Sequence, residues 1–144
     1  MDTKRKGHGA ATRARLGDAR SEVAGGQTNV GAFRTLPAVK AEDVRSNIGM
    51  AIPDWADFLG VSVKTYERRQ ERGDLDEKES LKVEMIIKIL YKAADVFEDE
   101  GVAAEWVTTP IISLDNMRPI DHLNSIDGYE RVANTLGKIR YGMY

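Results

Sequence analysis

The chain has 144 residues, of which 42% are apolar and 31% are charged, and it contains no cysteine. This composition is typical of one compact globular protein, and the missing cysteines exclude disulfides, thiol catalysis and thiolate metal sites. No segment reaches the roughly 18 uncharged apolar residues of a membrane span, and the charged amino terminus lacks the apolar core of a secretion signal. The sequence therefore predicts a cytoplasmic protein with no membrane partner. Only His8 and His122 supply imidazole, so we expect neither a metal nor another cofactor.

The net charge of −2 gives no sign of nucleic acid as a partner, but it hides an uneven distribution. Residues 1–36 hold seven Lys/Arg against three Asp/Glu, residues 37–100 hold ten against fifteen, and residues 101–144 hold four against five. The first segment also contains six of the thirteen glycines and few large apolar side chains. Residues 1–35 are therefore predicted to form a disordered basic arm, either a solvated tail or a segment that contacts DNA phosphates or a partner.

Beyond Leu36, glycines divide the chain into segments of helical length, and none shows the alternation of a strand. The pattern predicts an all-α fold. The longest helix should carry apolar residues every three or four positions and begin with acidic side chains that favour its dipole. The helices are expected over residues 41–49, from Pro53 to Leu59, over 63–71, over 76–99 and over 100–107.

The last third of the chain combines loops with one more helix. The uncharged run from Trp106 to Leu114 is expected to lie buried as irregular chain, with Trp106 as a core anchor. Pro119 should open a short turn, and Ser125 should cap a final helix. The apolar stripe of that helix is predicted to be ordinary core: Tyr129, Val132, Leu136 and Ile139.

The stretch from Ile52 to Glu71 has the layout of a helix-turn-helix, because Ala56 permits close approach of two helices and Gly60 suits a tight turn. The predicted shared core is Trp55, Leu59, Val61, Val63 and Tyr66. The outer face and end of the second helix would then supply the DNA contacts, for which the candidates are Ser62, Lys64, Thr65, Arg68, Arg69 and Arg72.

A purely structural helical hairpin is the alternative, because Glu67 and Glu71 interrupt the basic patch. Residues 37–100 carry a charge of −5, so a single copy should bind DNA weakly. DNA binding would then require a dimer, the basic arm or a partner.

The carboxy-terminal residues resemble the Xre/MbcA/ParS-like toxin-binding domain of bacterial type II antitoxins. The matching positions are Ala104, Trp106, Thr109, Pro110, Leu114, Pro119, Leu123, Ser125, Gly128, Val132, Leu136, Ile139 and Gly142. A second set resembles the Xre-type helix-turn-helix that precedes this domain: Gly60, Ser62, Thr65, Arg68, Arg69, Gly73, Leu75, Glu79 and Ser80. The similarity covers residues 36–144.

The resemblance implies a helix-turn-helix and dimerisation domain over residues 36–99 and a toxin-binding domain over residues 100–144. It implies an antitoxin that forms a homodimer, occludes the NAD site of a RES-domain toxin and represses its own operon at operator DNA. That toxin would consume NAD or transfer ADP-ribose from it. The candidate toxin contacts are Arg118, Asn134, Lys138, Arg140, Tyr141 and Tyr144.

The alternative function is a stand-alone transcription regulator whose carboxy-terminal domain only dimerises or senses a ligand. An enzyme is not expected. Asp121 and His122 are sequence neighbours, which do not face one another on a helix, and no glycine-rich phosphate loop or nucleophile elbow occurs.

Overall fold

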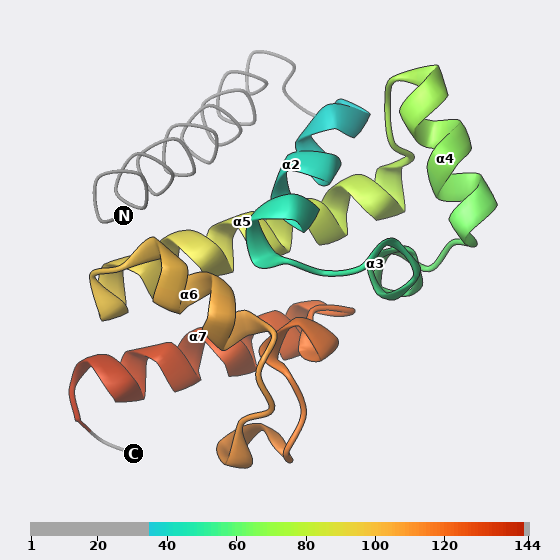
Figure 1. The fold of residues 1–144 in the computed structure, drawn as a ribbon. Helices are drawn as coiled ribbons and strands as arrows, with labels where there is room; N and C mark the ends of the chain where they lie inside the picture. The colour runs from blue at the N-terminus through green and yellow to red at the C-terminus, as the bar shows by residue number, and fades with distance from the viewer. Residues whose placement is uncertain (1–34, 143–144) are drawn as a thin grey trace, which may run out of the picture. The chain divides into compact units, whose positions relative to one another are not determined.

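The computed structural model describes residues 35–142, which form an all-α fold as the sequence predicts (Figure 1). No strand occurs in this part of the chain, where Pro37 with Asp74 and Ile111 with Met117 form isolated bridges. The predicted basic arm lies outside the described residues, apart from Thr35. The helices are α2 (Ala38–Ile48), α3 (Ile52–Leu59), α4 (Val63–Arg72), α5 (Glu77–Phe97), α6 (Glu100–Val107) and α7 (Ile126–Arg140), with short 3₁₀ turns η2 (Ile112–Leu114) and η3 (Pro119–His122).

The chain divides into two compact units, the first ending at Val83 and the second beginning at Glu84. Helix α5 starts in the first unit and ends in the second. The predicted domain boundary between residues 99 and 100 stays a prediction. No helix among residues 35–142 is long and apolar enough to cross a membrane.

The first unit packs α2, α3 and α4 around an apolar core. Backbone hydrogen bonds tie the segment before α2 to the α4–α5 turn, since Leu75 N donates to Leu36 O over 2.9 Å and Ala38 N donates to Gly73 O over 2.9 Å. The Leu36 amide also donates to the buried Ser80 hydroxyl over 2.8 Å. The fully buried side chains include Leu36, Val44, Trp55, Tyr66, Leu75 and Val83.

Helices α3 and α4 meet at the predicted tight turn. Gly60 has a φ of +80°, which a residue with a Cβ adopts only with strain. Ser62 caps α4 by accepting a hydrogen bond from the Thr65 amide, as predicted. The expected core position of Val63 is wrong. It is 36% exposed at the first position of α4, although it lies three residues before the buried Tyr66 and therefore on the same side of the helix.

The second unit surrounds a core between α6, α7 and the two 3₁₀ turns. Val132 and Leu136 are fully buried while Tyr129 and Ile139 lie half-buried, so the predicted stripe faces the core. Ser125 caps α7 through the Gly128 amide. The other buried side chains of this unit are Met85, Ile86, Ile87, Ile89, Leu90 and Ala93 on α5, and Ala103, Val107, Leu114, Pro119, Ile120 and Leu123 beyond it.

The prediction that residues 106–114 lie buried is wrong for most of the run. Thr109, Pro110 and Ser113 are exposed, and the side chain of Ile112 is 85% exposed. The loop closes on itself, since Ile111 N donates to Met117 O and Asn116 N donates to Ile111 O. This tight closure lets one side chain of the 3₁₀ turn, Leu114, reach the core and leaves Ile112 outside.

Candidate functional site

The first candidate surface is the amino-terminal part of α4. Ser62, Lys64 and Arg68 are exposed there, and Thr65 is half-buried. The Ser62 hydroxyl donates to Thr65 Oγ1 over 3.1 Å, and Arg68 Nη2 donates to the same oxygen over 3.2 Å. These bonds hold Arg68 along the first turn of α4. The geometry presents two cations, Lys64 and Arg68, on one exposed helix face.

The other two predicted DNA contacts, Arg69 and Arg72, take part in an ion-pair cluster at the end of α4. Arg69 is only 16% exposed and donates to Glu79 over 2.9 Å and to Asp76 over 2.7 Å. Arg72 pairs with Asp74 over 2.7 Å and with Asp76 over 2.9 Å. Hydrogen bonding to Arg72 holds the pKa of Asp76 below its usual value. These arginines therefore fasten α4 to the start of α5, a role that the sequence pattern did not reveal.

A partly buried polar contact fixes α4 against α2. The Tyr66 hydroxyl donates to Glu42 over 2.6 Å, and Arg45 Nε donates to the same carboxylate over 3.0 Å. Arg45 also donates to the carbonyl of Met50 over 2.6 Å. The Arg45 hydrogen bond lowers the pKa of Glu42 despite partial burial, which raises it. The position of α4 against α2 is thus set by hydrogen bonds as well as by apolar packing.

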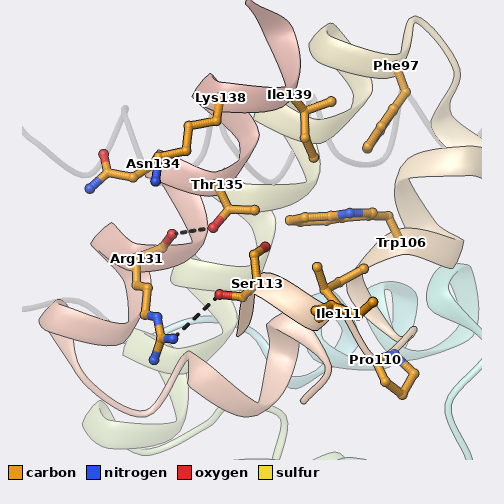
Figure 2. A pocket seen from close by; sticks show the side chains of 11 residues that line it. Phe97, Trp106, Pro110, Ile111, Ser113, Arg131, Asn134, Thr135, Lys138 and Ile139 are labelled. Carbon is orange, nitrogen blue, oxygen red and sulfur yellow. Dashed lines mark hydrogen bonds between the residues drawn. The ribbon is translucent and has the colours of Figure 1, made fainter. Parts of the chain in front are cut away.

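The second candidate surface is an open pocket of about 1040 Å³ in the second unit. The end of α5, α6, the loop around η2 and α7 supply its walls (Figure 2). The Phe97 and Trp106 rings meet in a tilted contact with centroids 5.9 Å apart. The lining residues are Phe97, Trp106, Pro110, Ile111, Ile112, Ser113, Arg131, Asn134, Thr135, Lys138 and Ile139.

Apolar and polar side chains occupy different sides of this pocket. Figure 2 shows Arg131, Asn134 and Lys138 along α7, across from Trp106 and Ile111, with the Asn134 and Lys138 side chains extending away from the Trp106 ring. Arg131 pairs with Asp115 over 2.9 Å and donates to the carbonyl of Ser113 over 3.5 Å. The Arg131 hydrogen bond lowers the pKa of Asp115. The arrangement is suited to binding a ligand or partner that is apolar on one side and anionic on the other.

The predicted toxin contacts fall at several places in the second unit. Asn134 and Lys138 line the pocket, whereas Arg118 pairs with Asp121 over 2.8 Å and is not among the lining residues. Arg140 forms an ion pair with Asp95. Tyr141 follows α7 and is 74% exposed. Tyr144 lies outside the described residues.

The sequence predicted toxin contact for Asn134 and Lys138 and missed the other nine lining residues, among them Phe97, Trp106, Ile112 and Arg131. Trp106 was interpreted as a core anchor, and it lies half-buried with its ring in the pocket wall. The available sequence signal was the uncharged run from Trp106 to Leu114, because an apolar loop that cannot be fully buried indicates a binding surface.

The one histidine of the described residues, His122, has a structural position. Its Nε2 lies 3.0 Å from the carbonyl oxygen of Leu114, which joins η3 to η2. Groups of three or more His, Asp or Glu side chains that could hold a metal ion do not occur among residues 35–142.

Comparisons with known proteins place these surfaces in a family context. Residues 92–142 match the antitoxin Xre/MbcA/ParS C-terminal toxin-binding domain. The chain is 27% identical to the antitoxin Xre of Photorhabdus laumondii subsp. laumondii over 118 residues, which cover 75% of this chain and 80% of that protein. It is 28% identical to the antitoxin Xre of Yersinia enterocolitica over 78 residues, which cover 54% of this chain and 53% of that protein.

One solved structure has the same fold at low sequence identity. It is the crystal structure of the M. tuberculosis MbcT–MbcA toxin–antitoxin complex. The match has a TM-score of 0.55 and 16% identity, and it covers 74% of this chain and 96% of the matched one.

Proposed function

Since this chain is an antitoxin of the Xre/MbcA type, we propose that it neutralises a RES-domain toxin by closing the toxin's NAD site with the end of α7. The match to the toxin-binding domain runs to residue 142 and includes the exposed Tyr141, which directly follows α7. This placement of an exposed aromatic ring directly after Arg140 is the observation that carries the proposal. An NAD site receives phosphates and aromatic rings, so a cationic and aromatic chain end can occupy its polar and ring-binding parts.

Arg140 is able to change partner in such a complex. Its ion pair with Asp95 joins two side chains that are both exposed, 39% and 70% respectively. Exposed ion pairs contribute little to stability, because water screens the charges and the side chains lose conformational entropy. A toxin carboxylate or carbonyl can therefore replace Asp95 at little cost to the fold.

The test is co-expression with the product of the neighbouring reading frame in bacteria. We expect that product to stop growth on its own and the full chain to restore growth. A chain lacking residues 141–144 keeps all of α7 and the pocket lining, so it should remain folded and fail to restore growth. Full protection by the shortened chain would refute the role of the chain end.

We also propose that the chain forms a homodimer and represses its own operon through α3 and α4. The support is the exposed first turn of α4, on which the Ser62 and Thr65 hydroxyls hold Arg68 beside Lys64. Two copies would present two such turns and so double the phosphate contacts, which compensates for the acidic helical body.

A gel-shift assay on the promoter region tests this second activity. Changing Lys64 and Arg68 to alanine should weaken binding at least roughly tenfold and lower its salt dependence. The matched control changes Lys88 and Lys92 to alanine, which removes the same charge from exposed positions on α5. Equal DNA binding by the two double variants would show that α4 does not contact DNA.

A further inference from the structure

We propose that the pocket of the second unit is a docking site separate from the chain end, and that it holds an apolar segment of the toxin carrying a carboxylate. The inference rests on the proposed toxin partner. It adds that most of the affinity for the toxin comes from this pocket. All of the lining residues fall within the toxin-binding domain of residues 92–142.

The exposed apolar surface at this pocket is the first argument. The side chain of Ile112 is 85% exposed at the pocket edge, beside the half-buried Trp106 and Ile111. Burying an apolar side chain of this size is favourable, so a partner that covers Ile112 gains binding free energy. Buried aromatic and aliphatic anchors of this kind commonly dominate the affinity of an interface.

The charge at the pocket identifies the occupant. The lining residues include two cations, Arg131 and Lys138, and no carboxylate. Asp115 neutralises Arg131 from outside the pocket and is itself 67% exposed. No ion pair to Lys138 occurs within residues 35–142, so a carboxylate on the bound segment would meet a cation that lacks a partner charge there.

The positive charge of the pocket argues against two other occupants, a second copy of this chain and residues 1–36 of the same chain. A second copy whose two-fold axis passed through the pocket would bring Arg131 and Lys138 close to their own equivalents, which like-charge repulsion opposes. Residues 1–36 of this chain hold seven Lys/Arg against three Asp/Glu, so they match the pocket poorly as well. A segment of the toxin with the opposite charge remains the occupant that these side chains favour.

The pocket and the chain end can be tested separately, because Ile139 is the last lining residue and Tyr141 lies beyond it. The pocket would supply affinity, while the chain end would supply inhibition. A chain without residues 141–144 should therefore still bind the toxin, whereas pocket variants should lose binding.

The experiment is calorimetric titration of full-length chain into the purified product of the neighbouring reading frame, without NAD. Ile112→Asp and Arg131→Glu should each weaken binding at least roughly tenfold. The matched controls are Ile126→Asp and Lys92→Glu. Ile126 is an apolar residue that is 62% exposed, and both positions lie outside the pocket. Both control variants should bind the toxin within about twofold of wild type. Circular dichroism should show unchanged helicity, since all four positions are exposed.

The possible outcomes separate this inference from the proposed function. Wild-type affinity for both pocket variants would overturn the docking site and leave the chain-end mechanism standing. A change in oligomeric state with wild-type toxin affinity would assign the pocket to contacts between copies and also overturn the inference. No binding and no growth rescue by the wild-type chain would overturn the proposed function, and the docking site with it.

Discussion

Changing Gly128 to alanine should destabilise the second unit, although alanine is the better helix former. Gly128 lies in the first turn of α7, where an added Cβ would come within 1.7 Å of the carbonyl oxygen of His122 and 3.3 Å of Ser125 Oγ. The first contact involves backbone, so either η3 or the start of α7 must move. Overpacking of this kind costs about 1–3 kcal/mol, and displacing the Ser125 cap adds about 1 kcal/mol.

The opposing gain is the helix propensity of alanine over glycine, about 1 kcal/mol. The net loss should be about 2 kcal/mol, which lowers Tm by about 6 °C in a chain of this size. Gly137 is the matched control on the same helix, because an added Cβ there meets nothing within 4 Å. Gly137→Ala should raise Tm by about 2–3 °C.

Thermal unfolding followed by circular dichroism at 222 nm compares the three chains under one condition. Opposite shifts in Tm for the two alanine variants are the expected result. A Gly128→Ala chain that melts at or above the wild-type temperature would refute the steric argument for this glycine.

Three further predictions concern polar contacts. Arg69→Met should lower the free energy of unfolding by about 3 kcal/mol in urea titration, because it leaves the carboxylate of Glu79, which is 4% exposed, without its cation. Adding Glu79→Gln to this variant should recover part of the lost stability. A further loss of stability would contradict the view that Arg69 compensates the buried charge of Glu79. The pKa of Glu42 is lowered from its ordinary value of 4.5, so the stability that its carboxylate contributes is fully present above that pH and is lost as pH falls through the folded-state pKa. Glu42→Gln should therefore flatten the dependence of the free energy of unfolding on pH below 4.5. An unchanged slope would contradict a stabilising role for this carboxylate. Ser125→Ala should cost about 1 kcal/mol in the same titration, and no loss would show that the cap is dispensable.

Most of the helical architecture could be predicted because local rules and tertiary packing agree. The helix over residues 100–107 and the caps at Ser62 and Ser125 were all predicted and confirmed. Asp115 has a φ of +62° and Asn116 a φ of +61°, which fits the tolerance of these residues for the left-handed region. Helix α2 begins at Ala38, earlier than expected, because Pro37 fixes its entry and backbone bonds hold that end.

The functional surfaces were harder to predict because they depend on which side of a loop faces water. Apolar character gave Ile112 a predicted core position, yet a short 3₁₀ turn has room for one buried side chain. Charge alone suggested DNA contact for Arg69, but its carboxylate partner Glu79 lies ten residues further along the chain. Such long-range pairing is not visible in helix periodicity.

The kinetics of NAD consumption test the central claim most directly. The rate of the purified toxin should be measured across NAD concentrations, with and without the full-length chain. If the chain end occupies the NAD site, the apparent KM for NAD should rise with the antitoxin while the maximal rate stays constant. A lowered maximal rate at unchanged KM would contradict occlusion, because the antitoxin would then be acting away from the NAD site.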